Sequence, residues 1–324
     1  MPAKIEFEVV QGWEKLPEGW SFVEVAGVAT DSKDRVYAFN RGEHPMIVFD
    51  SDGNFLDAWG EGIFTNPHGL YIGPDDRVYA VDNFDHTVRI FNTDGTLLQT
   101  LGSAHEPSDT GFEPGKSAVQ YGGGPFNRVT NLALDSQGDM FIADGYGNAR
   151  VHKFDNTGSH EFSWGEPGRG PGEFRLPHAI AVDEDDRIYV ADRENSRIQV
   201  FKPNGDYLQE WNHVTRPDDL FIDSQGILHI AELGEIAGQS PDHEILPHTP
   251  HASVCLMDLD GELITRFGGK DPVQPGNFFA PHGIWADSKG DLYVAEVVYS
   301  GGGNRGLVPL NCHSLQKFKR LQHD

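Results

Sequence analysis

The sequence predicts an all-β fold, a six-bladed β-propeller with four-stranded antiparallel blades, from two observations. Short apolar strands recur at intervals of roughly 40 residues, the usual length of a four-stranded propeller blade. Asp-Gly and Asn-Gly turns such as TDGT and PNGD separate neighbouring strands, as they do in antiparallel hairpins. Six such units cover residues 25–60, 67–102, 129–165, 177–212, 217–269 and 281–321.

Each unit has the same internal order. A first strand (GLYIG, AIAVD) leads through an acidic turn (GPDD, DEDD) to a second strand (RVYAV, RIYVA) and then a third (TVRIF, RIQVF). The sixth unit ends soon after its third strand, so we expect the N-terminal segment IEFEVVQGW to supply the missing outer strand. Residues 1–324 are therefore predicted to form a single propeller domain, closed by the N-terminal strand.

Three insertions interrupt the repeat, at residues 103–128, 233–253 and 297–312. In a four-stranded meander all three fall at the end of the blade that holds the loop after the second strand. Loops of this length in a compact domain are usually functional or disordered, and we interpret this end as the functional one.

The charge balance limits the partners. Fifty acidic residues against 25 Lys and Arg give a net charge of −25, which disfavours nucleic acid and anionic membrane surfaces. The N-terminus MPAKIEFEVV has no apolar stretch typical of a signal peptide, and no apolar run approaches ~18 residues. A cytoplasmic protein without membrane contact is expected. Cys255 and Cys312 are interpreted as ordinary thiols.

A Pro-His motif opens the first strand of every second unit. His68, His178 and His282 stand at the same repeat position in units two, four and six. First strands line the central channel of a propeller, so these imidazoles are expected to converge around one divalent metal ion with an open coordination position. Zinc is the first candidate, and Fe, Mn, Co or Ni also accept imidazole. The alternative is a coincidence of the repeat consensus.

The loops after second strands add three candidate catalytic residues. Arg41 and Arg193 occupy one repeat position, and Tyr146 lies one place further along. Two guanidiniums would bind a small-molecule substrate that carries a carboxylate or oxyanion, and a tyrosine beside a cation can act as a base. The alternatives are salt bridges between each Arg and the abundant acidic residues, and a packing role for the Tyr.

Two further groups of residues are weaker candidates for a functional role. Acidic residues share the last position of the second strand and are expected to tie the loop backbone: Asp82, Asp144, Asp192 and Glu232. Three histidines of the second insertion resemble a metal cluster, although a polar lid is the preferred interpretation: His243, His248 and His251.

The repeats look like NHL repeats. Three segments, FIADGYGNARVHKF, YVADRENSRIQVF and PHGLYI, are similar to the catalytic core of peptidyl-α-hydroxyglycine α-amidating lyases. The resemblance implies that three Pro-His histidines, here His68, His178 and His282, bind zinc. It implies that Tyr146 deprotonates the substrate hydroxyl and that Arg41 and Arg193 stabilise the reacting centre. The implied reaction splits the C–N bond of an N-acyl-α-hydroxyglycine into an amide and glyoxylate.

The chain departs from that family at two positions. Gly283 replaces an Asp that helps to hold a structural calcium, which leaves calcium open, and Gly147 replaces a disulfide cysteine. The insertions lie where the acyl part of the substrate would lie, so the substrate itself is open. A C–N lyase is the preferred function. A lactonase-like hydrolase that uses metal-activated water and a non-catalytic NHL interaction module are the alternatives, and the sequence predicts no oligomeric state.

Overall fold

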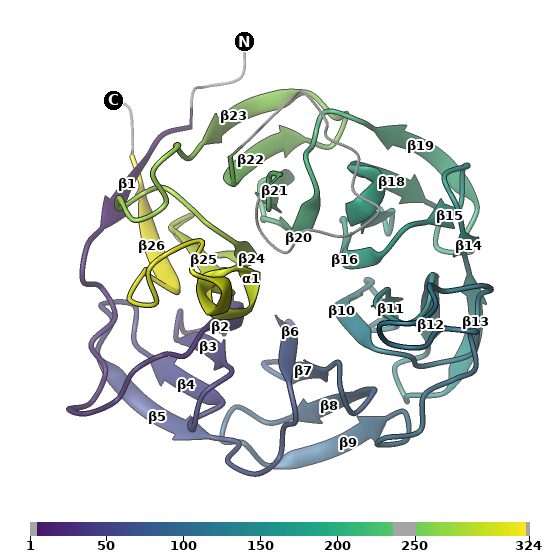
Figure 1. The fold of residues 1–324 in the computed structure, drawn as a ribbon, viewed down its shortest axis with the longest axis horizontal. Helices are drawn as coiled ribbons and strands as arrows, with labels where there is room; N and C mark the ends of the chain where they lie inside the picture. The colour runs from purple at the N-terminus through teal and green to yellow at the C-terminus, as the bar shows by residue number, and fades with distance from the viewer. Residues whose placement is uncertain (1–4, 236–250, 322–324) are drawn as a thin grey trace. The chain divides into compact units, whose positions relative to one another are not determined.

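The computed structural model describes residues 5–235 and 251–321. The fold is the all-β six-bladed propeller that the repeats predict, with four-stranded antiparallel blades (Figure 1). The chain divides into two compact units, which are described separately: the central unit, Gly62–Pro217, and the terminal unit, Met1–Glu61 with Asp218–Asp324.

The central unit contains blades two, three and four. Blade two consists of β6 (Pro67–Ile72), β7 (Val78–Asp82), β8 (Thr87–Phe91) and β9 (Leu97–Leu101). Blade three consists of β10 (Val129–Leu134), β11 (Met140–Asp144), β12 (Arg150–Phe154) and β13 (His160–Trp164). Blade four consists of β16 (Pro177–Val182), β17 (Ile188–Asp192), β18 (Arg197–Phe201) and β19 (Tyr207–Trp211). Shorter elements are the parallel pair β14 (Glu166–Pro167) and β15 (Glu173–Phe174) and the 3₁₀ turn η1 (Arg193–Asn195).

The terminal unit contains blades one, five and six. Blade one consists of β2 (Val25–Thr30), β3 (Val36–Asn40), β4 (Met46–Phe49) and β5 (Phe55–Trp59). Blade five consists of β20 (Pro217–Ile222), β21 (Ile227–Glu232), β22 (Ser253–Asp258) and β23 (Leu263–Phe267). Blade six consists of β24 (Pro281–Ala286), β25 (Leu292–Glu296), β26 (Leu315–Arg320) and β1 (Phe7–Val10).

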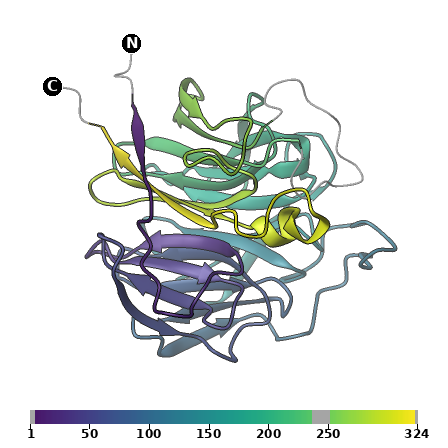
Figure 2. The ribbon, with the colours of Figure 1, turned by 60° about the vertical axis from the view of Figure 1, so that its left-hand side comes forward.

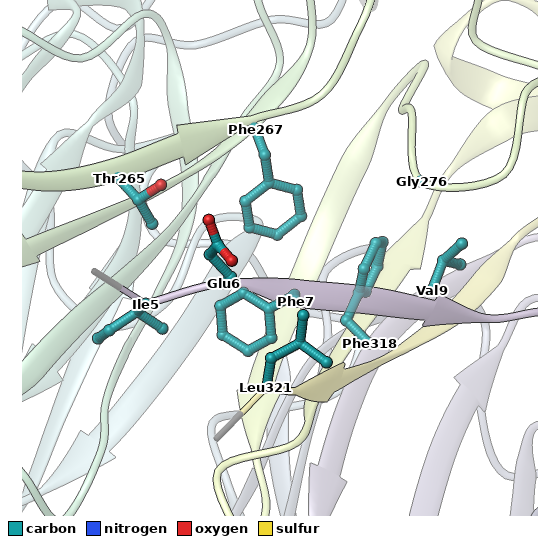
Figure 3. Close-up of a pocket in the computed structure, with 9 residues that line it drawn as sticks. All are labelled: Ile5, Glu6, Phe7, Val9, Thr265, Phe267, Gly276, Phe318 and Leu321. Atoms are coloured by element: carbon teal, nitrogen blue, oxygen red, sulfur yellow. The ribbon is translucent and has the colours of Figure 1, made fainter. Parts of the chain in front are cut away.

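The N-terminal strand is the outermost strand of blade six. β1 runs antiparallel to β26, with Phe7 opposite Arg320 and Val10 opposite Lys317 (Figure 2). An apolar groove lies beside β1, where Phe7, Phe267 and Phe318 gather (Figure 3). The residues that line this groove include neither a histidine nor an arginine, so it offers none of the candidate chemistry.

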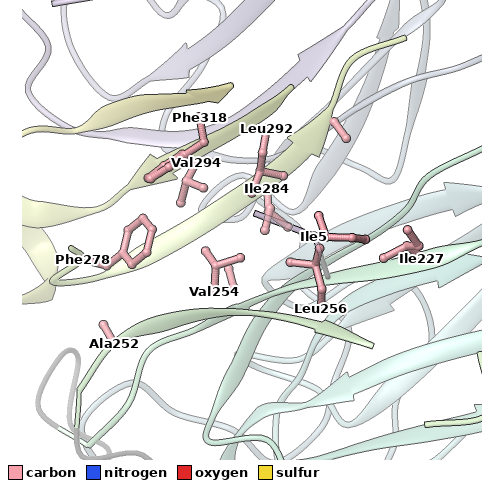
Figure 4. Close-up of a cluster of buried hydrophobic side chains, with 12 residues drawn as sticks. Ile5, Ile227, Ala252, Val254, Leu256, Phe278, Ile284, Leu292, Val294 and Phe318 are labelled. Carbon is pink, nitrogen blue, oxygen red and sulfur yellow. The ribbon is translucent and has the colours of Figure 1, made fainter. Parts of the chain in front are cut away.

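The hydrophobic core lies between neighbouring blades. In the terminal unit, Val254 and Leu256 of β22 pack with Leu292 and Val294 of β25 (Figure 4). All four side chains are buried, and full burial of such a side chain stabilises the fold by about 1.5–3 kcal/mol. The second strand of a blade, such as β11, β17 or β25, is buried on both faces. Its sequence is therefore a nearly continuous apolar run rather than an alternation of apolar and polar residues.

The acidic turn of the repeat has a structural cause. The hydroxyl of Tyr189 in β17 donates a 2.8 Å hydrogen bond to Asp183, and Tyr293 in β25 donates to Asp287 over 3.0 Å. Asp183 also accepts the backbone N–H of Arg187 over 2.8 Å. In blades four and six, one carboxylate position therefore closes the turn and holds the central tyrosine of the second strand.

The insertions differ in what they contain. Residues 103–128 form an ordered loop, and residues 297–312 include α1 (Val298–Gly301) and η2 (Gly303–Arg305). His243 and His248 of the second insertion lie outside the described residues, so the preferred interpretation, a polar lid rather than a metal cluster, stays a prediction. No helix in the described ranges is long and apolar enough to cross a membrane.

Candidate metal centre

A backbone irregularity positions each predicted metal-binding histidine. In β16 the ladder with β17 shifts by one residue between Pro177 and Ala179, so His178 is the extra residue of a β-bulge. The same shift surrounds His68 in β6 and His282 in β24. A bulge interrupts pairing and redirects a side chain, and it is common next to functional sites. The same shift also occurs at Ala26 in β2 and at Thr130 in β10, so the bulge belongs to the repeat and the Pro-His motif places a histidine on it.

Hydrogen bonds select the tautomer of two of these histidines. Nδ1 of His68 lies 2.8 Å from the carbonyl oxygen of Thr130 in the central unit. Nδ1 of His282 lies 2.6 Å from the carbonyl oxygen of Ala26 in the terminal unit. A carbonyl only accepts, so each Nδ1 carries the hydrogen and each neutral ring keeps its Nε2 lone pair for a ligand.

The residues present fit a metal ion. His68, His178 and His282 are all buried, and together this triad could hold one. Nitrogen lone pairs of neutral imidazoles are the ligands that Zn²⁺ and other first-row divalent ions prefer. The carbonyl partners of His68 and His282 supply the outer hydrogen bonds that usually orient metal-binding histidines.

Within the central unit four of the predicted residues come together around one oxygen. The Oη atom of Tyr146 lies 3.0 Å from Nε2 of His178 and 3.4 Å from Nε2 of His68. Nη1 of Arg193 donates a 3.2 Å hydrogen bond to the same oxygen. The guanidinium also lies over the tyrosine ring, 5.3 Å from its centroid. The predicted base thus contacts two predicted metal ligands and one predicted cation.

Glycines on both sides of Tyr146 allow this position. A Cβ atom at Gly145 would lie 2.2 Å from the carbonyl oxygen of Pro177, and one at Gly147 would lie 2.1 Å from Oδ1 of Asn127. Thr110 of the first insertion donates a 2.6 Å hydrogen bond to the carbonyl oxygen of Gly147. The insertion therefore packs directly against the Tyr146 loop and holds it.

A buried ion cluster supports Arg193. Oε1 of Glu194 accepts a hydrogen bond from Nε of Arg193 over 2.9 Å and from Nη2 of Arg216 over 3.0 Å. Burial favours the neutral acid, but the two guanidiniums outweigh it and hold the pKa of Glu194 below its ordinary value. Glu194 therefore connects Arg193 to Arg216 through one carboxylate oxygen. Sequence reasoning missed Arg216.

Arg41 lies in the terminal unit and pairs with an acidic residue. Its Nη1 atom donates to Oε1 of Glu24 over 2.9 Å and to Oγ of Ser300 over 3.3 Å. Oε2 of Glu24 accepts the backbone N–H of Ser300 over 2.7 Å. The salt bridge considered as the alternative is thus present, and the catalytic role of Arg41 stays a prediction.

The acidic residues at the ends of the second strands tie the loops, as expected, in blades two to four. Backbone N–H groups that precede the first strand donate to these carboxylates, from Asn66 to Asp82 over 3.1 Å, from Asn127 to Asp144 over 2.9 Å and from Arg175 to Asp192 over 2.7 Å. Glu232 of blade five accepts from the side chains of Ser253 and Arg266. Burial raises the pKa of Asp192 to about 6.

Gly283 leaves little space for a side chain. A Cβ atom there would lie 2.9 Å from the Cα atom of Gly27 in β2. Gly69 of blade two is constrained in the same way, since its Cβ would lie 2.5 Å from the carbonyl oxygen of Thr130. Close approach of neighbouring first strands explains the glycine of the Pro-His-Gly motif, and Gly283 has no side chain to offer calcium.

The fold and these residues define a class, the NHL-repeat propellers. Residues 174–201 match the family model described as NHL repeat. The chain is 34% identical over 302 residues to NHL repeat-containing protein 3 of Mus musculus, covering 90% of this chain and 81% of that protein. It is 34% identical over 216 residues to the Homo sapiens protein, covering 65% of this chain and 61% of the relative. The chain belongs to this family.

The predicted relationship to amidating lyases is also found. Peptidyl-α-hydroxyglycine α-amidating lyase 1 of Drosophila melanogaster is 31% identical over 258 residues, or 74% of this chain and 44% of the lyase. The chain thus spans less than half of that enzyme. Among solved structures, a gluconolactonase from Xanthomonas campestris superposes with a TM-score of 0.61 at 14% identity, over 93% of this chain and 87% of the other, which shows the shared fold.

Proposed function

We propose that this protein is a metal-dependent lyase that cleaves the C–N bond of a carbinolamide, an N-acyl-α-hydroxyglycine or a close analogue. The observation that carries the proposal is the contact of one phenolic oxygen, Oη of Tyr146, with His178, His68 and Arg193. A tyrosine held between imidazoles and a guanidinium is suited to take a proton from a substrate hydroxyl. The 31% identical lyase relative supports this chemistry.

The three buried histidines would hold the divalent ion, with zinc as the first candidate. When bound, such an ion supplies Lewis-acid polarisation of a substrate oxygen. The Nδ1 hydrogen bonds of His68 and His282 keep the Nε2 lone pairs free of hydrogen for that purpose. Their burial restricts the access of water to the ligand atoms.

The reaction is an elimination without net oxidation. Tyr146, acting as the base, removes the proton of the carbinol hydroxyl, and the O–H electron pair forms the C=O bond of glyoxylate as the C–N bond breaks. The departing amide nitrogen takes up a proton, so protons balance over the cycle. Arg193 donates to Oη of Tyr146 and offsets negative charge there, and Glu194 with Arg216 fixes the position of Arg193. Arg41 is proposed to assist from the terminal unit.

The substrate is proposed to be a small molecule with a carboxylate, converted by a cytoplasmic protein that binds neither nucleic acid nor membrane. The net charge of −25 supports the exclusion of polyanionic partners. Gly147 stands where the lyases have a disulfide cysteine, and the Thr110 hydrogen bond holds the same loop without a disulfide. A reducing compartment would therefore leave the Tyr146 loop intact.

The direct test is turnover of α-hydroxyhippurate by protein supplied with zinc, with glyoxylate and benzamide measured as products. The proposal expects both products in equal amounts and their loss in Tyr146→Phe. Lactone hydrolysis without glyoxylate formation, or no turnover of any carbinolamide by metal-replete protein, would contradict it.

A further inference from the structure

We propose that Arg128, held between Phe84 and Phe112, binds the carboxylate of the substrate. This inference deepens the proposed function and rests on it for the identity of the substrate. It concerns residues of the central unit alone.

The guanidinium of Arg128 is placed by aromatic rings. Its Cζ atom lies 4.9 Å from the ring centroid of Phe84 and 5.8 Å from that of Phe112. Phe84 belongs to the loop after β7, and Phe112 belongs to the first insertion. A guanidinium stacked on a ring keeps its in-plane N–H groups available, and these N–H groups match the two oxygens of a carboxylate.

Among residues 5–235 and 251–321, Arg128 forms no ion pair with an acidic residue. Arg193 and Arg216 share Glu194, and Arg41 pairs with Glu24. In the part of the chain that the structure describes, no hydrogen bond or ion pair engages the guanidinium of Arg128.

The backbone holds Arg128 in a costly conformation. Its φ angle is 62°, in the left-handed region that non-glycine residues seldom adopt. The backbone N–H of Arg128 donates a 2.9 Å hydrogen bond to Nδ1 of His86, which stabilises that conformation. The same left-handed conformation recurs at Leu176 and Arg216, which also directly precede a first strand, so the repeat fixes the point at which the Arg128 side chain leaves the backbone.

Arg128 is close to the candidate base. The preceding residue, Asn127, accepts the backbone N–H of Gly147 over 3.1 Å, and Gly147 is the neighbour of Tyr146. Two residues after Arg128, the carbonyl of Thr130 accepts from His68. Partial burial lowers the pKa of Arg128, and electrostatic interaction with Tyr146 acts in the opposite direction. A carboxylate on Arg128 would thus place the adjacent carbinol carbon near Tyr146.

Ligand binding tests this assignment apart from turnover. Hippurate has the carboxylate but not the reactive hydroxyl, and hippurate methyl ester lacks the charge. Wild-type protein is expected to bind hippurate more tightly than the ester. Arg128→Gln is expected to lose about 10- to 100-fold in hippurate affinity with little change for the ester, because one charge-assisted hydrogen-bonded pair is removed. Arg77→Gln is the matched control, since Arg77 is exposed and pairs with Asp75.

The outcomes separate the two proposals. Loss of hippurate preference in Arg128→Gln without turnover by wild-type protein supports the subsite and overturns the lyase function. Turnover with an unchanged carboxylate preference in Arg128→Gln overturns the subsite and leaves the lyase function standing. Wild-type protein that does not distinguish hippurate from its ester overturns the subsite. Arg128→Lys, which keeps the charge but loses the planar group, is expected to recover part of the preference.

Discussion

The Oη atom of Tyr146 lies 3.0 Å from Nε2 of His178. The two residues come from different blades of the central unit, a loop after β11 and the bulge in β16. The hydrogen-bonded pair connects the candidate proton acceptor to a candidate metal ligand. The proposed chemistry depends on this connection, and the first two predictions follow from it.

Tyr146→Phe removes the oxygen and leaves the ring in place. We expect kcat for carbinolamide cleavage to fall by about 10²- to 10⁴-fold, the usual contribution of a positioned base. Metal content should stay unchanged, because the histidine Nε2 atoms are retained. Steady-state kinetics and elemental analysis of the same sample measure both. Tyr121→Phe, at an exposed tyrosine of the first insertion, is the control and should behave as wild type. Full activity of Tyr146→Phe would remove this residue from the mechanism.

Arg193→Gln and Glu194→Gln should differ in what they impair. Arg193→Gln removes the donor to Tyr146 while Glu194 keeps its ion pair with Arg216, so activity should be lost with metal and fold retained. Glu194→Gln removes the carboxylate that two buried guanidiniums share, which should destabilise the protein by about 3 kcal/mol. Urea unfolding and activity assays compare them. Equal stability of the two variants would show that the shared carboxylate is not needed.

Gly147→Ala tests whether the position of Tyr146 depends on close packing. The new Cβ would lie 2.1 Å from Oδ1 of Asn127, so the loop must move. We expect kcat to fall more than about tenfold, since small displacements of catalytic groups are costly. Gly124→Ala is the matched control in the neighbouring insertion, because no atom lies within 4 Å of its added Cβ. Similar kcat values for the two variants would argue against the packing requirement.

His313 should make stability depend on pH. Burial lowers the pKa of His313, but its 3.1 Å contact with Glu296 and its 3.0 Å contact with the carbonyl of Asn277 outweigh burial, so the pKa is raised above 6.5. A histidine with a raised pKa in the folded state stabilises it fully below the unfolded value and loses that contribution as pH rises through the folded value.

The measurement compares wild type with His313→Gln by urea unfolding between about pH 6 and about pH 9. The stability advantage of wild type should shrink across this range. An advantage that grows with pH would contradict the assignment of a charged His313 beside Glu296.

The fold was predictable because it repeats. The apolar strands recur in every blade, and in blades four and six the hydrogen bonds of Tyr189 to Asp183 and of Tyr293 to Asp287 connect the acidic turn to the second strand. Aligning the repeats with one another also placed His68, His178 and His282 at one equivalent position. The β-bulges at these histidines could not be predicted, because a one-residue shift in strand pairing leaves no mark in the composition.

The contacts of the arginine side chains could not be predicted from the sequence alone. Arg41 and Arg193 could be aligned, but their partners Glu24 and Glu194 depend on how loops fold. Arg128 and Arg216 both stand directly before the first strand of a blade, in blades three and five, and this shared position was the available signal. Stacking of Arg128 on Phe112 depends on the path of an insertion that has no repeat equivalent, so sequence periodicity could not reveal it.

Metal content per chain tests the central claim most directly. Protein purified without chelator is to be analysed for zinc and other first-row metals, alongside His178→Ala and the control His105→Ala in the first insertion. We expect about one divalent ion per chain in wild type and in the control, and its loss together with activity in His178→Ala. A wild-type protein that stays metal-free after incubation with Zn²⁺ and other first-row divalent ions, or a His178→Ala variant that keeps its ion, would contradict it.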